Sequence, residues 1–250
     1  MEVLENFGLN NPLESSVLTI GSYDGIHRGH HEIIKSLVSH SKILDIKSVV
    51  ITFNPHPRHV LNKRNEDFSI LMSLKIKLET FKHLGIDKVY VIPFNKKFSK
   101  KSAKDFLDET IIPFFNPKYI VTGEDHHFGK DRSGSTNFLK KYCLKKGILL
   151  KVIKLVNDNG KKISSTNIRK LISNGFIRRA NYELGSIYGF EGKVIHGKGR
   201  GRDLNFPTAN ISPHESKQLM PKPGVYLIVA KNNGLLMYGM CNFGSRPTFK

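Results

Sequence analysis

Short apolar runs alternate with longer amphipathic stretches from residue 17 to about residue 171. The runs are rich in β-branched residues and predict five strands, at 17–21, 48–53, 88–94, 118–123 and 148–156. Apolar residues at helical spacing predict helices near 33–38, 71–81, 102–111, 138–145 and 164–173. This alternation favours an α/β fold, in which a parallel sheet carries helices on both faces. In such sheets, ligands bind beyond the carboxyl ends of the strands.

The pattern changes after residue 186. Short strand-like runs broken by Gly, Pro and "KNNG" follow, at 192–211, 224–230 and 235–243, without helical spacing. These runs predict a separate antiparallel β module. We therefore expect two domains, residues 1–183 and 184–250. The second is small, because roughly 65 residues are marginal for a core of their own.

The composition narrows the class of protein. The 250 residues are 39% hydrophobic and carry a net charge of +19, spread along the chain, which points to anionic partners. Dispersed charge suits a protein that handles phosphorylated metabolites as well as one that binds RNA, and it favours a solvated basic surface without a polymer partner. The chain contains neither a membrane-span-like apolar run nor a secretory signal at its N-terminus. Cys143 and Cys241 lie far apart, as expected in a reducing cytoplasm. The sequence indicates no oligomeric state.

The stretch "GSYDGIHRGH" (21–30) joins the first strand to the first helix. Gly21 and Gly25 permit a sharp turn, and a helix N-terminus attracts anions. His27 and His30 lie three residues apart, so both can direct donors at one anion and stabilise charge that develops on a phosphate. The alternative is that one histidine caps the helix and the others are solvated. The position after the first strand favours the phosphate site.

The stretch "ISSTNIR" (163–169) opens the last predicted helix. Ser164 or Ser165 can cap that helix, and a cap alone explains two hydroxyl groups. Arg169 lies one turn on from Thr166 or Ser165, where its guanidinium can hold a phosphate with two hydrogen bonds. The sequence leaves cap and phosphate site equally open.

Polar residues also follow two other strands. Asp125, in "VTGEDHHFGKDRSG" (121–134), can accept hydrogen bonds from a ligand or help to hold a cation. Asn54, His56 and Arg58, in "TFNPHPRHVL" (52–61), can line the same crevice, although the two prolines can simply shape a loop.

The predicted β module contains "GKGRGRDLNFPTAN" (197–210). Its glycines suggest that the backbone approaches phosphates closely, but the Walker pattern is absent. Thr208 and Asn210 offer the oxygen donors that Mg²⁺ or a phosphate contact requires.

Six motifs occur in order: "GSYDGIHRGH", "TFNPHPR", "GEDHHFG", "ISSTNIR", "GKVIHGKGRG…NFPTANI" and "NFGSRPTF". Together they resemble the prokaryotic bifunctional riboflavin kinase/FAD synthetase family, from about Val17 to Phe249. HxGH by itself marks a wider nucleotidyltransferase superfamily.

The resemblance implies an HxGH nucleotidyltransferase domain with a Rossmann-like parallel sheet. That domain would join FMN and ATP, with Mg²⁺, to give FAD and pyrophosphate. It also implies a six-stranded β-barrel that phosphorylates riboflavin to FMN. Membrane partners are not implied.

The resemblance also assigns the site residues. The catalytic positions would be His27, His30 and Arg169. Contacts with ATP and FMN would come from Gly21, Tyr23, Asp24, Gly25, Asn54, His56, Pro57, Arg58, Gly123, Asp125, Phe128, Ser164, Ser165 and Thr166. The kinase nucleotide and flavin positions would be Gly197, Gly201, Pro207, Thr208 and Asn210, with Thr208 and Asn210 also as Mg²⁺ ligands.

The chain departs from the family pattern in several places. Tyr23 and His126 stand where the family has Phe, and Asn205 replaces a Gly. Family members continue past "RPTF" with further barrel strands and a catalytic glutamate. We therefore expect an incomplete barrel, FAD synthesis, and little kinase activity from this chain.

Several alternatives stay open. The chain can be fully bifunctional, or a related nucleotidyltransferase that uses pantetheine phosphate or nicotinamide mononucleotide. It can also be a basic nucleic-acid-binding protein on a degenerate enzyme fold, or a fragment that folds poorly beyond Gly192.

Overall fold

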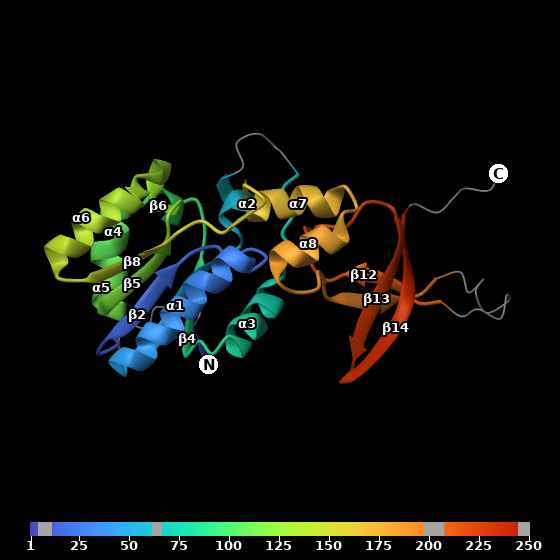
Figure 1. Cartoon of the computed structure of the whole chain (residues 1–250), viewed down its shortest axis with the longest axis horizontal. Helices are drawn as coiled ribbons and strands as arrows, with labels where there is room; N and C mark the ends of the chain where they lie inside the picture. Colours follow the sequence, from blue (N-terminus) through green and yellow to red (C-terminus); the bar gives the residue numbers. More distant parts are fainter. Residues whose placement is uncertain (5–11, 62–66, 198–207, 245–250) are drawn as a thin grey trace.

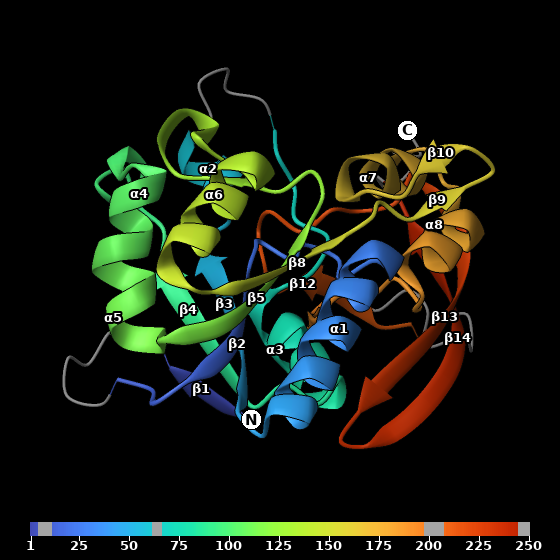
Figure 2. The same ribbon diagram turned by 60° about the vertical axis from the view of Figure 1, so that its left-hand side comes forward.

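The computed structural model describes residues 1–4, 12–61, 67–197 and 208–244. Its main sheet consists of β1 (Glu2–Leu4), β2 (Ser16–Ile20), β3 (Lys47–Asn54), β4 (Lys88–Pro93), β5 (Pro117–Gly123) and β8 (Leu149–Ile153). All six strands are parallel, in the order β1-β4-β3-β2-β5-β8. Figure 1 shows the sheet within the whole chain, and Figure 2 labels all six strands. The five predicted strands and the α/β fold are confirmed, although β8 ends at Ile153, before the predicted end. The pattern does not predict β1, since three residues are too few to show a period.

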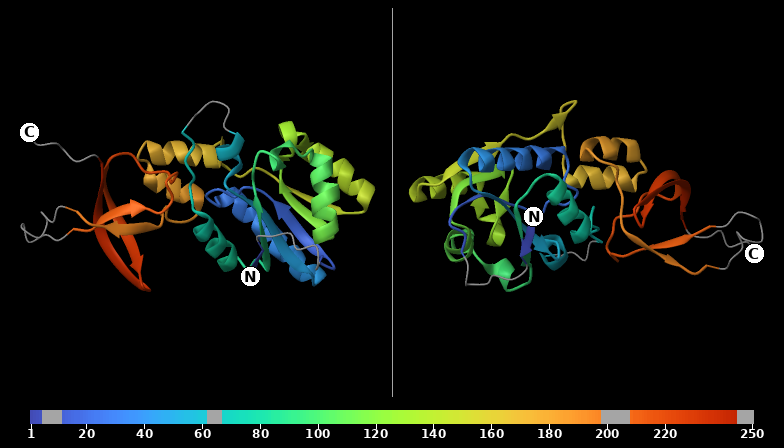
Figure 3. Two further views of the ribbon diagram at one scale, coloured as in Figure 1. Left: turned by 180° about the vertical axis from the view of Figure 1, so that it is seen from behind. Right: turned by 90° about the horizontal axis from the view of Figure 1, so that it is seen from below.

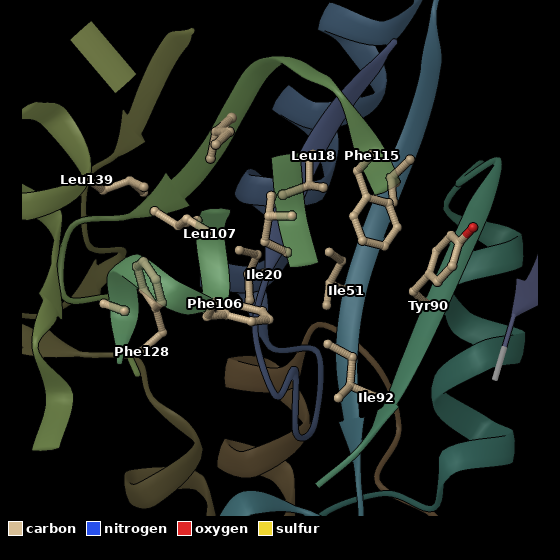
Figure 4. Close-up of a cluster of buried hydrophobic side chains, with 14 of the residues drawn as sticks. Leu18, Ile20, Ile51, Tyr90, Ile92, Phe106, Leu107, Phe115, Phe128 and Leu139 are labelled. Carbon is tan, nitrogen blue, oxygen red and sulfur yellow. The ribbon is translucent and has the colours of Figure 1, made fainter. Parts of the chain in front are cut away.

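Helices cover both faces of the sheet (Figure 2). They are α1 (Arg28–Leu44) and α3 (Leu74–His83) on one face, and α4 (Ala103–Phe106), a π-helical segment (Leu107–Ile111), α5 (Ile112–Phe115) and α6 (Thr136–Lys146) on the other. Successive strand side chains point to opposite faces, so Val17 packs with the first group and Leu18 with the second. Figure 4 shows the apolar cluster between the sheet and the second group of helices, where Phe106 and Leu107 face the strand residue Ile20. The predicted helix at 102–111 thus continues to Phe115.

Local signals explain most helix ends. Ser73 caps α3, accepting a hydrogen bond from Ile76 N at 3.3 Å, so this helix begins three residues after the start of the predicted one at 71. Pro113 lies inside the continuous helical stretch, shortly after the π-helical segment. The short elements are α2 (Pro57–Leu61), β6 (His127–Phe128), β7 (Gly134–Ser135), β9 (Asn157–Asp158), β10 (Lys161–Lys162) and 3₁₀ turns at Phe98–Lys100 and Lys130–Arg132. Across the described ranges, every helix is too short or too polar to cross a bilayer.

Two further helices, α7 (Ser165–Ser173) and α8 (Ile177–Leu184), follow the sheet. They enclose a third apolar cluster that contains Leu71, Ile168 and Ile172. α7 is predicted, whereas α8 is not. α8 also runs across the domain boundary that we expected after residue 183.

The remaining strands form two antiparallel pairs beyond α8. β11 (Gly192–Ile195) pairs with β12 (Asn210–Pro213), and β13 (Gly224–Asn232) pairs with β14 (Leu235–Phe243). The turn between the last two is Asn233–Gly234, with φ of 47° and 84°, the backbone that a tight hairpin needs. In Figure 3 these strands lie beyond α7 and α8, away from α6. Antiparallel strands are confirmed, but the described residues contain no closed barrel.

Candidate functional site

The loop between β2 and α1 is tightly folded. Tyr23, Gly25 and Ile26 have φ of 48°, 86° and 35°, the left-handed region that side chains generally avoid. The Tyr23 hydroxyl lies 2.6 Å from Thr19 Oγ1, and its ring is buried. Gly25 has a φ that side chains rarely adopt, and a Cβ there would lie 2.7 Å from Leu71 Cδ1, so both the backbone and the space favour glycine. Gly21 precedes this turn, under the Tyr23 ring.

His27 and His30 form a stacked pair at the N-terminus of α1. Their ring centroids are 3.8 Å apart and the rings are inclined by 16°. Both Nδ1 atoms are buried, and neither has a hydrogen-bond partner among the described residues. His27 occupies the N-cap position, but its side chain makes no capping hydrogen bond, so the capping alternative is wrong for this residue. The pair therefore offers unsatisfied ring nitrogens where the helix attracts anions.

Burial keeps both rings neutral at pH 7. It lowers the pKa of His27 to about 4, against an opposing effect of the Asp125 charge. It also lowers the pKa of His30 well below its ordinary value, helped by the charges of His27 and Lys77. Each neutral ring keeps one N–H donor and one lone pair.

Asp24, three residues before His27, forms a largely buried ion pair with Arg169 of α7. The Asp24 carboxylate accepts hydrogen bonds from Leu71 N, at 3.0 and 3.1 Å, and from Met72 N, at 3.3 Å. Arg169 Nε donates to Ser69 O at 2.8 Å, and its side chain is only 14% exposed. Burial raises the pKa of Asp24, and the Arg169 charge opposes that rise. Arg169, predicted to hold a phosphate, is thus held by protein groups on two sides.

Lys77 is a site residue that the sequence analysis misses. It is buried in α3, and its Nζ donates to Ser22 O at 2.7 Å. Burial lowers the pKa of Lys77 to about 8, while the Asp24 charge opposes the shift. A signal exists in the sequence, because Lys77 lies within the apolar stripe of Leu74, Leu78 and Phe81.

Phe68 is the second missed residue, and it connects two predicted segments. The Arg169 Cζ lies 4.3 Å from the Phe68 ring centroid, and the Arg58 Cζ lies 4.5 Å from it. The His56 ring centroid is 4.7 Å away. Burial lowers the pKa of His56 to about 3. Asn54 is exposed, and Pro57 begins α2, so the 54–58 segment reaches the site through His56 and Arg58.

The start of α7 reaches the same loop. Ser164 caps α7, accepting from Asn167 N at 3.3 Å, while Ser165 Oγ donates to Asp24 O at 2.8 Å. Thr166 is exposed beside them. Cap and contact with the site therefore coexist in this segment, in different serines.

Asp125 and its neighbours complete the carboxyl end of the sheet. Asp125 is exposed and pairs with Lys162, and it follows Gly123 at the end of β5. Phe128 is buried, with the His126 ring stacked at 5.5 Å between centroids. Burial lowers the pKa of His126 to about 4.

The predicted kinase residues lie elsewhere, in the antiparallel region. Thr208 is exposed, and Asn210 begins β12. A Cβ at Gly197 would lie 2.0 Å from Asn210 Nδ2, so Gly197 packs directly on Asn210. Gly201, Asn205 and Pro207 lie outside the described residues. Throughout the described ranges, no three His, Cys, Asp or Glu side chains converge as a metal site would require.

Comparisons with known proteins agree with this division. The FAD synthetase family model matches residues 9–167, and the riboflavin kinase family model matches residues 184–250. The bifunctional riboflavin kinase/FMN adenylyltransferase of Bacillus subtilis is 37% identical over 234 residues, covering 94% of this chain and 73% of the relative. The enzyme of that name from Escherichia coli K12 is 30% identical over 238 residues, covering 95% and 75%.

A solved structure is also similar over the whole chain. It is a macrolide-efflux protein from Streptococcus pneumoniae, with a TM-score of 0.88 and 28% identity, covering 100% of this chain and 81% of that one. The chain spans about three-quarters of the length of the two relatives above. With both family models matched in order along it, the chain belongs to the bifunctional riboflavin kinase/FAD synthetase family.

Proposed function

We propose that this protein transfers AMP from ATP to FMN, giving FAD and pyrophosphate, in a domain of residues 1–183. The observation that carries the proposal is the neutral His27–His30 pair, unsatisfied at a helix N-terminus beyond the central strand. The FAD synthetase family match over residues 9–167 supports the same activity.

The reaction needs little covalent chemistry from the protein. An FMN phosphate oxygen attacks the α-phosphorus of ATP, the bond to the bridging oxygen breaks, and pyrophosphate leaves. The nucleophile is already anionic, so a general base is unnecessary, and positioning and charge stabilisation account for the catalysis. His27 and His30 donate to phosphate oxygens. Arg169 and Lys77 share one buried carboxylate, Asp24, so the three groups together leave one net positive charge near the pair.

The other residues would shape the substrate crevice. Gly21, Tyr23, Asp24 and Gly25 set the loop that faces the triphosphate. Contacts with ATP and FMN would come from Asn54, His56, Pro57, Arg58, Gly123, Asp125, Phe128, Ser164, Ser165 and Thr166.

Mg²⁺ would enter with ATP and neutralise phosphate charge. Mg²⁺ in such sites is held mainly by phosphates and waters, with one or two protein carboxylates. The exposed Asp125 carboxylate fits that limited role, since the negative charge of Asp125 acts on His27 and so lies near the pair.

A second activity is proposed for residues 184–250, because the riboflavin kinase family model matches them. The reaction would be the phosphorylation of riboflavin with ATP; the low level of kinase activity expected from the sequence stays a prediction, which the riboflavin assay below tests. Gly197, Thr208 and Asn210 would contact the nucleotide, with Thr208 and Asn210 as Mg²⁺ ligands and Gly201 and Pro207 as further contacts. We also propose a cytoplasmic location, which the free cysteines Cys143 and Cys241 support.

One pair of assays tests both activities. The purified chain is incubated with FMN, ATP and Mg²⁺, or with riboflavin, ATP and Mg²⁺, and flavins are separated by chromatography. FAD in the first assay, abolished by a chelator, is the expected result. No FAD above the enzyme-free control overturns the proposal. Pantetheine phosphate, nicotinamide mononucleotide and a salt series of nucleic-acid binding test the rival functions in parallel.

A further inference from the structure

The segment Phe68–Met72 lies between the proposed adenylyltransferase site and the antiparallel region. On the side of the site, the N–H groups of Leu71 and Met72 donate to the Asp24 carboxylate. The Ser69 carbonyl accepts from Arg169 Nε at 2.8 Å. The backbone of this segment therefore fixes both members of the buried ion pair.

The other side of the segment is bound by residues 217–219. Ile70 N donates to Lys217 O, and Leu219 N donates to Ile70 O, each at 2.9 Å, which makes a parallel β-bridge. Gln218 Nε2 lies 3.2 Å from Leu71 O and 3.4 Å from Ile70 O. These contacts span 147 and 148 residues of sequence.

Gln218 is unusual in its region. Its side chain is 6% exposed, and it is the sole buried residue that the structure describes after Leu184. Its amide also donates to the Tyr188 hydroxyl at 2.8 Å, and that hydroxyl in turn donates to Leu219 O. A buried primary amide is unfavourable unless its hydrogen bonds are made, so these bonds define one orientation of the side chain.

The peptide groups Ile70–Leu71 and Leu71–Met72 each make hydrogen bonds through both the carbonyl and the N–H. The Ile70–Leu71 peptide receives Gln218 and Leu219 at its carbonyl and donates to Asp24 through its N–H. The Leu71–Met72 peptide receives Gln218 at its carbonyl and donates to Asp24 in the same way. A peptide group is planar and rigid, so a shift at the carbonyl moves the N–H. Hydrogen bonds in such chains also strengthen one another.

We propose that Gln218 is a positioning residue for the adenylyltransferase centre. Through these two peptide groups it orients Asp24, and through Asp24 it orients the Arg169 guanidinium. The antiparallel region thus contributes a side chain that completes the site of the parallel-sheet region. This inference rests on the proposed FMN adenylyltransferase activity.

Gln218→Met tests the proposal, because it removes the amide but keeps the length of the side chain. We expect kcat for FAD synthesis to fall about 10-fold, the scale of lost buried hydrogen bonds, with the KM for FMN changed less than about 2-fold. Lys217→Met is the matched control, since that side chain is 56% exposed and pairs with an exposed aspartate. The control is expected to keep kcat within about 2-fold of the original value.

A double-mutant cycle separates positioning from general destabilisation. Arg169→Lys keeps a cation beside Asp24 but loses the planar fork. In that background, Gln218→Met is expected to lower kcat less than about 2-fold further, because both changes act through one guanidinium. A further 10-fold loss of kcat in the double variant would show that Gln218 does not act through Arg169.

Hydrogen exchange gives a readout that does not depend on catalysis. In Gln218→Met, amide exchange over Phe68–Met72 is expected to accelerate about 10-fold, while β2 exchanges at its original rate. If the original chain makes no FAD, the proposed function fails, and the exchange result still decides whether Gln218 fixes this segment. Unchanged kcat or unchanged exchange overturns the inference.

Discussion

The parallel sheet and the antiparallel strands use apolar residues in opposite ways. All five residues of β2 are buried, whereas β14 is exposed along most of its length. Leu227 on β13 is 89% exposed, and Tyr238 on β14 is 83% exposed. Both regions contain strands rich in apolar residues, but among the described residues helices cover the two faces of the parallel sheet and do not cover β13 and β14. His27, His30 and Lys77, whose pKa values are lowered, all lie in the helix-covered region, because burial is the main cause of each shift.

The largest expected effect is a difference in unfolding free energy between a variant in the parallel-sheet region and one in the antiparallel strands. Phe81 is fully buried against α1 and the sheet, so Phe81→Ala is expected to cost about 3–5 kcal/mol of unfolding free energy. Leu227→Ala removes an exposed side chain and is expected to change it by less than about 0.5 kcal/mol. Urea unfolding followed by circular dichroism measures both. Equal losses would contradict the comparison.

The next effect concerns catalysis in the covered region. His30→Ala removes one of the two unsatisfied rings at the N-terminus of α1. We expect kcat for FAD synthesis to fall about 100-fold or more, equivalent to about 2.7 kcal/mol of transition-state stabilisation. His31→Ala, one residue further along α1, and Leu227→Ala serve as controls, each within about 3-fold. A near-normal rate for His30→Ala would contradict the proposed role of His30 as a donor to the phosphate oxygens.

The pH dependence of stability gives a smaller effect. The pKa of His126 is about 4 in the fold, against about 6.5 when unfolded. Between these values the unfolded chain binds more protons, so the unfolding free energy decreases as pH falls from 7 towards 4. His126→Phe removes this destabilisation of the fold, which is about 2 kcal/mol at pH 5. The variant keeps an aromatic ring beside Phe128.

Urea unfolding at pH 7.5 and pH 5 measures that difference. His27 and His56 act in the same direction, because burial lowers both pKa values, so the variant is expected to show a shallower dependence and not a flat one. Leu227→Ala is the control, with the original dependence. Identical losses at pH 5 in the original chain and in His126→Phe would show that this ring is not a source of the effect.

The sequence predicts what depends on neighbours along the chain. The strands and the turn after β2 follow from periodicity and from the residues next to them. The resemblance also brings the first loop, residues 54–58 and α7 to one site, and contacts through Asp24 and Phe68 join these segments.

Contacts between residues far apart in the sequence cannot be predicted from local periodicity. The apolar stripe around Lys77 indicates that this lysine is buried, but it does not indicate that its Nζ donates to Ser22 O. Phe68 and Gln218 lie in short irregular segments without a period, and their roles depend on residues about 100 and 147 positions away. The π-helical segment Leu107–Ile111 arises within an ordinary helical pattern, which does not indicate where an extra residue is accommodated.

The smallest expected effect tests which contact between the two regions matters. Another contact between the two regions is the ion pair of Lys75 with Glu191. Lys75 is 69% exposed, and exposed ion pairs contribute little because water and salt screen them. Lys75→Met is therefore expected to change kcat for FAD synthesis less than about 2-fold and the unfolding temperature by less than about 2 °C. Gln218→Met introduces the same side chain at the same boundary, so the pair compares a buried amide with an exposed charge. Equal losses of kcat would mean that surface charge, and not the two peptide groups, connects the antiparallel strands to Asp24.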